Sequence, residues 1–222
     1  MIKKLLSFFT PIIEQKIPSQ TNKQLEITWN NGRLVLDTEN TNYSFGNLEK
    51  VLRKGLKYVG FSKIRNMENA LILGLGGGSI IHLLRKDIKF KGTITSIELD
   101  PAIIFVANEY FNLDALSENH TIMQMDAFEY VLTTEATFDL IVIDIFKDAE
   151  MPAFLFEKYF IDKLKSLLNL NGFIIFNTIV LNKKNKNRNN HYTTQYEADI
   201  FSVKRYPNMQ NLNEVITIKR HK

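Results

Sequence analysis

From residue 70 onward, short runs of apolar residues alternate with longer stretches of helical pattern. Nearly continuous apolar runs are typical of strands that are buried on both faces of a parallel sheet. The pattern predicts strands at 70–73, 93–97, 121–125, 138–143 and 173–180. It predicts helices that start at 79–85 and that cover 102–110, 127–132 and 154–168. This alternation predicts a doubly wound, mostly parallel α/β sheet with helices on both faces.

The segment before residue 70 has a different pattern. Within 24–38, apolar and polar residues alternate on both sides of Asn31-Gly32, which predicts a β-hairpin. Residues 46–60 carry apolar side chains at three- and four-residue spacing and should form a helix. The first residues favour an amphipathic helix over a secretory leader, because polar residues interrupt the apolar patch and no small-residue cleavage site follows. We expect an N-terminal unit over 1–60 and a main domain over 61–222.

The last forty residues complete the predicted sheet. The Lys- and Asn-rich stretch 182–190 indicates a loop, and 191–197 a helix. Two further strands are expected at 199–206 and 214–219, joined through Pro207-Asn208. They would form an antiparallel edge and bring the sheet to seven strands.

Composition excludes several kinds of chemistry. The 222 residues contain no cysteine, which excludes disulfides, cysteine-ligated metals and a thiol nucleophile. The four histidines have unrelated spacings, so no metal is expected. The net charge of +4 has a local component at 183–188 and 219–222; we interpret these runs as solvated and expect neither a nucleic-acid nor a membrane partner. No apolar run approaches the roughly 20 residues that span a bilayer, which favours a cytoplasmic location.

A glycine-rich turn follows the first strand of the main domain. It reads Gly74-Leu75-Gly76-Gly77-Gly78-Ser79 and leads directly into a helix. Glycines allow positive φ angles and close backbone approach, and the helix start offers free N–H groups to a ligand. The turn lacks the lysine of a phosphate-binding loop, and Ser79 replaces the third glycine of the dinucleotide fingerprint.

Three acidic residues stand at the ends of consecutive strands: Glu98, Asp126 and Asp144. Any one of them could simply cap the following helix. Together they lie where ligands bind to open α/β sheets, outside the carboxyl ends of the strands. Glu98 also follows the last glycine by about 20 residues, the position from which a carboxylate accepts ribose hydroxyls.

These residues resemble the class I S-adenosylmethionine-dependent transferases. Within that fold, 96–101, 126–130 and 138–144 are most similar to the spermidine synthase family. The resemblance implies that the turn holds the cofactor's amino-acid part, that Glu98 with Leu99 binds ribose and that Asp126 with Ala127 binds adenine. It also implies that Asp144 is catalytic and faces the acceptor. The residues implied to bind the cofactor are Gly74, Gly76, Gly77, Gly78, Glu98, Leu99, Asp126 and Ala127.

The chain departs from that family at three places. Gly77 stands where typical aminopropyltransferases carry an acid, and 144–148 replaces their Asp-Ser-x-Asp-Pro motif. Tyr43-Ser44-Phe45-Gly46 replaces the acids and glutamine expected near the first helix. Tyr43 and Asp148 are candidate acceptor-binding residues, although the pattern favours Tyr43 as an aromatic that packs the hairpin on the sheet, and Asp148 could lie in a solvated loop. We interpret His82 as structural.

Three functions therefore remain open. The first is aminopropyl transfer from decarboxylated S-adenosylmethionine to an amine, which the strand ends favour. The second is methyl transfer from intact S-adenosylmethionine to a small molecule, which Gly77 favours. The third is a nucleoside-binding module without catalysis. In each case the expected partner is a small molecule, such as an amine acceptor, and a homodimer is allowed for.

Overall fold

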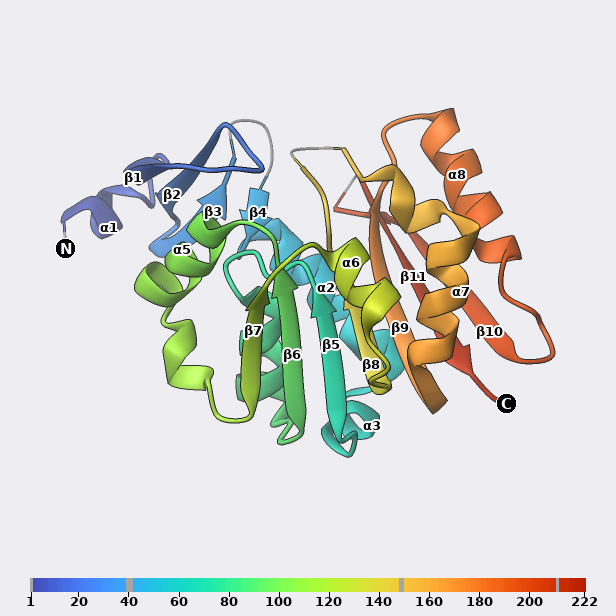
Figure 1. The fold of residues 1–222 in the computed structure, drawn as a ribbon. Helices are drawn as coiled ribbons and strands as arrows, with labels where there is room; N and C mark the ends of the chain where they lie inside the picture. Colours follow the sequence, from blue (N-terminus) through green and yellow to red (C-terminus); the bar gives the residue numbers. More distant parts are fainter. Residues whose placement is uncertain (1, 39–41, 148–149, 211) are drawn as a thin grey trace.

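The computed structural model describes residues 2–38, 42–147, 150–210 and 212–222, without the side chains of Asn42 and Tyr43. Its centre is a seven-stranded sheet of order β10-β11-β9-β8-β5-β6-β7 (Figure 1). The five strands from β9 to β7 run parallel, and β11 and β10 add an antiparallel edge. The strands are β5 (Asn69–Leu73), β6 (Thr93–Glu98), β7 (His120–Gln124), β8 (Phe138–Ile143), β9 (Leu168–Ile179), β10 (Phe201–Met209) and β11 (Asn213–Arg220). The predicted doubly wound, seven-stranded fold is confirmed.

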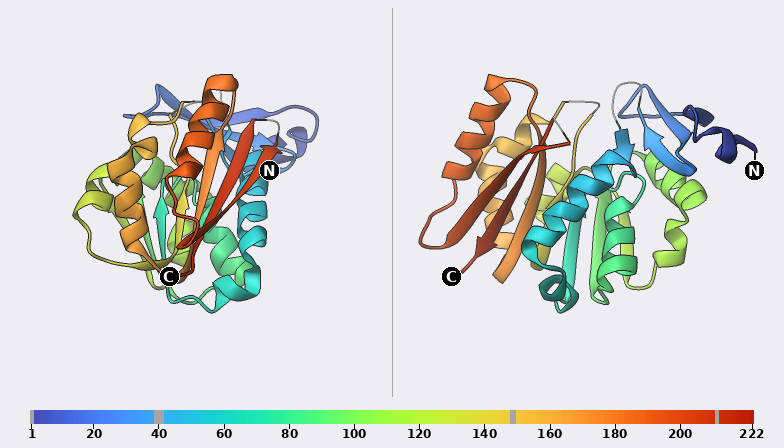
Figure 2. Two further views of the ribbon diagram at one scale, coloured as in Figure 1. Left: turned by 90° about the vertical axis from the view of Figure 1, so that its right-hand side faces the viewer. Right: turned by 180° about the vertical axis from the view of Figure 1, so that it is seen from behind.

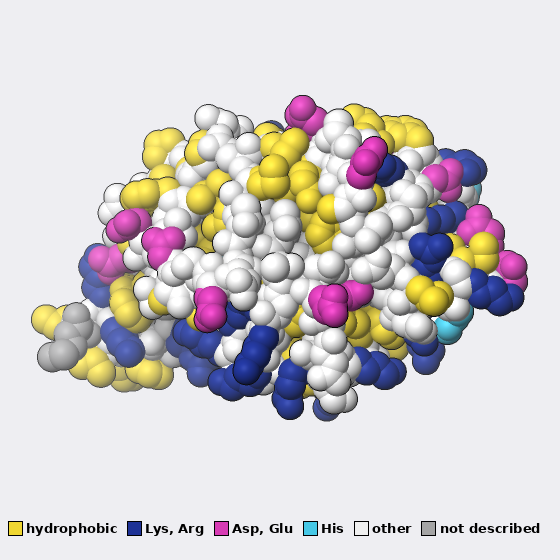
Figure 3. Space-filling model, turned by 60° about the horizontal axis from the view of Figure 1, so that its bottom comes forward, with side chains coloured by type: hydrophobic (Ala, Val, Ile, Leu, Met, Phe, Trp, Pro, Cys, Tyr) yellow, Lys and Arg dark blue, Asp and Glu magenta, His cyan; other side chains and the backbone are white. Residues whose placement is uncertain are grey.

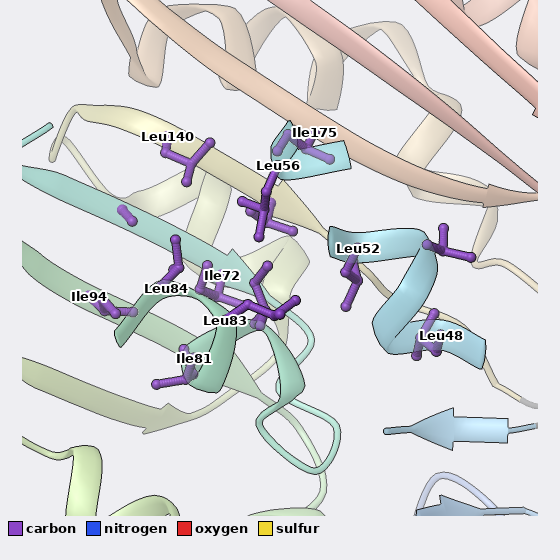
Figure 4. Close-up of a cluster of buried hydrophobic side chains, with 14 of the residues drawn as sticks. Leu48, Leu52, Leu56, Ile72, Ile81, Leu83, Leu84, Ile94, Leu140 and Ile175 are labelled. Atoms are coloured by element: carbon purple, nitrogen blue, oxygen red, sulfur yellow. The ribbon is translucent and has the colours of Figure 1, made fainter. Parts of the chain in front are cut away.

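Helices cover both faces of this sheet (Figure 2). On one side lie α2 (Asn47–Val59), α3 (Phe61–Arg65), α4 (Ser79–His82), the π-helical turn η1 (Leu83–Ile88), α5 (Pro101–Phe111) and the 3-10 turn η2 (Leu113–Leu116). On the other lie α6 (Ala127–Thr133), the 3-10 turn η3 (Ala153–Phe156), α7 (Lys158–Leu167) and α8 (Lys183–Thr194). Figure 4 shows the core beneath α2, where Leu52 and Leu56 point toward Ile72 of β5 and Ile175 of β9. Full burial of each such side chain stabilises the fold by about 1.5–3 kcal/mol.

A second, four-stranded antiparallel sheet lies N-terminal to α2. It consists of β1 (Ile12–Pro18), β2 (Gln24–Asn30), β3 (Arg33–Asp37) and β4 (Asn42–Ser44), preceded by the short helix α1 (Ile2–Leu6). The predicted hairpin is confirmed as β2–β3, with positive φ at Asn31 and Gly32 in its turn. This sheet packs on α5, where Leu25 and Ile27 meet Ile103 and Val106. The division of the chain at residue 60 stays a prediction.

Three expectations about the C-terminal half are wrong. The stretch 182–190 is not a loop but most of α8, which Asn182 caps by accepting from the Asn185 N–H. Pro207-Asn208 does not join the last two strands, because both residues lie within β10 and the turn follows Met209. The helix expected over 154–168 is divided into η3 and α7, and Leu168 already belongs to β9.

The basic residues are distributed differently from the sequence interpretation. Residues 47–92 contain ten Lys and Arg but only three Asp and Glu, so this segment, which includes α2, α3 and η1, carries as large a positive excess as the two runs singled out in the sequence together. Figure 3 shows Lys and Arg side chains gathered along the lower margin of the view that brings the bottom of the molecule forward. No helix in the described parts of the chain is both long enough and apolar enough to cross a bilayer.

Candidate active site

A cavity of about 440 Å³ opens at the carboxyl ends of β5, β6, β7 and β8. This volume lies within the roughly 300–1,000 Å³ of small-molecule sites. Seven predicted residues contribute to its wall: Gly74, Gly76, Glu98, Leu99, Asp126, Ala127 and Asp144. Nine others complete it: Gln20, Thr21, Ile97, Met125, Ile145, Phe146, Lys147, Pro152 and Phe154. Apolar walls beside three carboxylates fit a nucleoside, because the ring needs apolar contact and the sugar hydroxyls need acceptors.

Gly74 lets the ends of two strands approach each other. Its φ is +90°, and a Cβ at this position would lie 2.3 Å from the carbonyl oxygen of Asp144. The Gly74 N–H donates to the Ile97 carbonyl oxygen at 3.0 Å, and the Asp144 N–H donates to the Leu73 carbonyl oxygen at 2.9 Å. The glycine therefore fixes the position of Asp144 relative to β6.

Glu98 is buried and closes the glycine turn from below. Its Oε2 accepts from the Leu75 N–H and its Oε1 from the Asp100 N–H, both at 3.0 Å. Burial raises the pKa of Glu98, and the hydrogen bonds from Asp100 and Leu75 oppose this increase. The Gly76 N–H also bonds this carboxylate, so the three backbone donors leave part of its capacity of about four acceptor sites for a sugar hydroxyl.

Asp126 combines a structural and a candidate binding role. Its Oδ1 accepts from the Phe128 N–H at 2.8 Å and so caps α6. Its position on the cavity wall, beside Ala127, leaves the other oxygen available to a ligand. Helix capping and ligand binding are therefore compatible here.

Asp144 is held by a short chain of amides. Asn177 at the end of β9 is fully buried, and its Nδ2 donates to Asp144 Oδ1 at 2.8 Å. Asn213 Nδ2 in turn donates to Asn177 Oδ1 at 3.0 Å, which fixes the orientation of that amide. Burial raises the pKa of Asp144 to about 7, and the Asn177 hydrogen bond opposes this increase. A carboxyl group of this pKa can accept a proton near neutral pH.

The N-terminal sheet contacts the glycine turn through Ser79. The Ser79 hydroxyl lies 2.6 Å from the Ser44 Oγ and accepts from the Phe45 N–H at 2.8 Å. A Cβ at Gly77 would lie 3.0 Å from Ser44 Cβ and 3.1 Å from Phe45 Cε2. The turn therefore has little space for a side chain at Gly77.

The remaining candidates lie away from the cavity or outside the description. Gly77 and Gly78 face β4 and Leu113 respectively, rather than the cavity wall. The His82 ring lies 2.9 Å from the Phe111 carbonyl oxygen and meets Phe45 edge-on, in agreement with a structural role. Asp148 lies outside the described residues, and the same holds for the side chain of Tyr43.

Sequence reasoning missed two groups of site residues. Gln20 and Thr21 come from the β1–β2 loop, about 80 residues before the acids that they approach, and no local motif marks them. Asn177 lies near the end of a predicted strand, so the rule that drew attention to the strand-end acids could have found it. Among the described residues there is no group of three or more His, Asp and Glu placed to hold a metal ion.

Comparison with known proteins identifies one family. A family model described as the spermine/spermidine synthase domain matches residues 49–211. A polyamine aminopropyltransferase of Vibrio vulnificus is 29% identical over 119 residues, which cover 52% of this chain and 39% of that protein. An eEF1A lysine and N-terminal methyltransferase of Xenopus laevis is 30% identical over 122 residues, which cover 50% of this chain and 17% of that protein. These alignments span less than half the length of both relatives.

Two solved structures have the same fold. A spermidine synthase from Thermotoga maritima aligns with a TM-score of 0.67 at 19% identity, covering 95% of this chain and 73% of that one. A probable spermidine synthase from Corynebacterium glutamicum aligns with a TM-score of 0.74 at 15% identity, covering 94% and 80%. At these identities the likeness shows the fold alone.

Proposed function

The chain belongs to the spermine/spermidine synthase domain family, and on that premise we propose that it transfers an aminopropyl group from decarboxylated S-adenosylmethionine to a small amine. The bound co-substrate would supply an electrophilic carbon attached to a sulfonium. As the amine forms the C–N bond, the C–S bond would break and its electron pair would remain on the sulfur. Gly74, Gly76, Glu98, Leu99, Asp126 and Ala127 are the residues that would hold it. Gly77 and Gly78 would shape the turn from outside the cavity.

The observation that carries the proposal is the environment of Asp144. Its carboxyl group lines the nucleoside-sized cavity, one oxygen is fixed by Asn177, and burial raises its pKa to about 7. At neutral pH such a group is ionised in a large fraction of molecules and can accept a proton from the acceptor's ammonium group, which frees the amine lone pair for attack. The rest of the catalysis is alignment of two bound molecules, for which no covalent enzyme intermediate is needed.

Product analysis tests this function. The purified chain is incubated with decarboxylated S-adenosylmethionine and a panel of primary mono- and diamines, and released 5′-methylthioadenosine and aminopropylated amine are measured by mass spectrometry. Asp144→Asn should slow release by ~10²-fold or more. Asp162→Asn, the same change at an exposed acid on α7, should leave the rate unchanged. If no amine in the panel supports release, aminopropyl transfer is excluded for these acceptors.

Gly77 favours methyl transfer from intact S-adenosylmethionine as a second candidate. The turn carries no acidic side chain at this position that would repel the carboxylate of the intact form. Calorimetry with the two forms of the co-substrate distinguishes the candidates: tighter binding of the intact form favours methyl transfer. Binding of a nucleoside without turnover of either form would indicate the non-catalytic module.

Several finer expectations belong to the same proposal. Tyr43 and Asp148 are proposed to contact the acceptor, and their alanine variants should raise the KM of the acceptor without weakening nucleoside binding. The absence of a metal requirement is tested by activity in the presence of a chelator. A cytoplasmic location, a homodimer and the lack of nucleic-acid partners stay predictions.

A further inference from the structure

The loop between β1 and β2 is fastened to the main domain by one buried carboxylate. Asp100 is fully buried, and its Oδ2 accepts four hydrogen bonds from this loop. The donors are the Ser19 hydroxyl at 2.5 Å, the Gln20 N–H at 3.0 Å, the Thr21 N–H at 3.1 Å and the Thr21 hydroxyl at 2.9 Å. A buried carboxylate requires such donors, because without them its desolvation is uncompensated.

The same residue is connected to the nucleoside cavity on its other side. Its Oδ1 accepts from the Ala102 N–H at 2.9 Å and caps α5, and its own N–H donates to Glu98 Oε1. Gln20 and Thr21, which Asp100 holds, contribute to the wall of the same cavity as Glu98. Asp100 therefore contacts both the β1–β2 loop, through its side chain, and Glu98, through its backbone N–H.

The loop itself is built to present its donors together. The Asn22 N–H donates to the Ser19 hydroxyl at 2.8 Å, and the Asn22 side-chain amide donates to the Thr21 hydroxyl at 3.0 Å. Both hydroxyls are thus oriented so that their own protons point to Asp100. Burial alone would raise the pKa of Asp100, but the hydrogen bonds from Ser19, Thr21 and Ala102 outweigh it and lower the pKa. The carboxylate therefore stays charged at neutral pH.

We propose that Asp100 is a positioning residue that holds the β1–β2 loop closed over the nucleoside cavity, and that loop closure and nucleoside binding are coupled through its carboxylate. The proposal rests on the nucleoside site of the proposed function. If only the closed loop completes the cavity, the apparent dissociation constant rises as the closed fraction falls. By reciprocity, a bound nucleoside holds the loop closed.

Calorimetry with 5′-methylthioadenosine and the full chain tests the coupling. Asp100→Asn removes the charge, and Ser19→Ala/Thr21→Val removes both hydroxyl donors while leaving the cap of α5 intact. Each change should weaken binding by ~10-fold or more. Combining them should weaken binding little further, because both remove the same attachment. Ser7→Ala is the matched control, since this buried hydroxyl holds the Gly32 N–H at 2.9 Å in the β2–β3 turn, and binding should not change.

Amide hydrogen exchange provides a readout that does not depend on activity or affinity. Exchange in residues 19–23 should slow when nucleoside is added to the wild type and should be fast in both states of Asp100→Asn. Unchanged affinity in Ser19→Ala/Thr21→Val, or strictly additive effects in the cycle, would overturn the coupling. A wild-type chain that binds no nucleoside would instead refute the proposed function, so the two failures are distinguishable. If Asp100→Asn does not fold, the affinity of Ser19→Ala/Thr21→Val alone tests whether loop closure and nucleoside binding are coupled.

Discussion

Asn177→Leu tests whether the environment of Asp144 controls its proton affinity. The substitution keeps a similar side-chain size but removes the Nδ2–H that donates to Asp144 Oδ1. The hydrogen bond favours the ionised carboxylate, so its loss must raise a pKa that burial already raises to about 7. The acid side of the pH–rate profile should therefore move to higher pH.

The size of the shift follows from the kind of hydrogen bond that is lost. A bond to a charged group contributes about 1.5–3 kcal/mol, and about 1.4 kcal/mol corresponds to one pKa unit. The expected increase is about 1–2 units. At pH 7 the ionised fraction would fall from about one half to roughly 1–10%, a loss of about 5–50-fold that is recovered near pH 9.

The titration can be measured without knowing the acceptor. Carbon-13 NMR of aspartate-labelled protein gives the carboxyl titration curves, and Asp144→Asn identifies the signal of this residue. The profile of kcat/KM against pH provides the second measurement once an acceptor is known. Asn169→Leu is the matched control, because its amide donates to Asp139 at 2.9 Å near the opposite end of the sheet. An Asp144 midpoint that stays unchanged or falls in Asn177→Leu would refute the reasoning.

Three further predictions concern stability and binding. Folding raises the pKa of Asp144 from 3.8 to about 7, so the stability that its neutral form contributes is present below about pH 4 and is lost as the pH rises to 7. In urea unfolding, Asp144→Asn should therefore match the stability of the wild type near pH 4 and exceed it by up to about 4 kcal/mol at pH 8. Glu98→Gln should weaken nucleoside binding ~10-fold or more in calorimetry, and an unchanged affinity would remove its role. Gly74→Ala should lower the free energy of unfolding by about 3 kcal/mol or more, because the new Cβ would lie 2.3 Å from a carbonyl oxygen. Gly60 also has a positive φ, but the nearest atom to a Cβ there is 3.8 Å away, so Gly60→Ala should lower the free energy of unfolding by only about 1–2 kcal/mol.

The parallel core could be predicted from sequence because its central strands β5 and β8 and the second half of β9 are nearly continuous apolar runs. The strand Phe138–Ile143 has the predicted bounds, and its last four residues are buried. The failures occur where tertiary contacts decide. Helix α8 has almost no apolar face, and its buried side chains include the polar Asn189, which bonds Thr178 and Glu214. Pro207 lies in β10, which is an edge strand. A proline is tolerated there because its missing N–H can be on the side that has no neighbouring strand.

The site was predictable to the extent that its residues follow the strand-end rule. Glu98, Asp126 and Asp144 all line one cavity because parallel strands end at the same edge. The strand-end rule cannot predict Gln20 and Thr21, which line the cavity only because the separate N-terminal sheet packs on α5. Such contacts between distant segments have no periodicity or motif, so only the folded chain reveals them.

The strand-end acids show that capping a helix and facing the cavity do not exclude each other. Asp126 does cap a helix, yet it faces the cavity; Glu98 caps none, yet both its oxygens hold backbone N–H groups. Together with a bond from the Gly76 N–H, they orient the Glu98 carboxylate and leave part of its acceptor capacity for a sugar hydroxyl. Because the same carboxylate closes the glycine turn, truncating it to alanine would disturb the fold as well as the binding. Glu98→Gln is therefore the better test, since it keeps the side-chain length and changes mainly the charge that the sugar would meet.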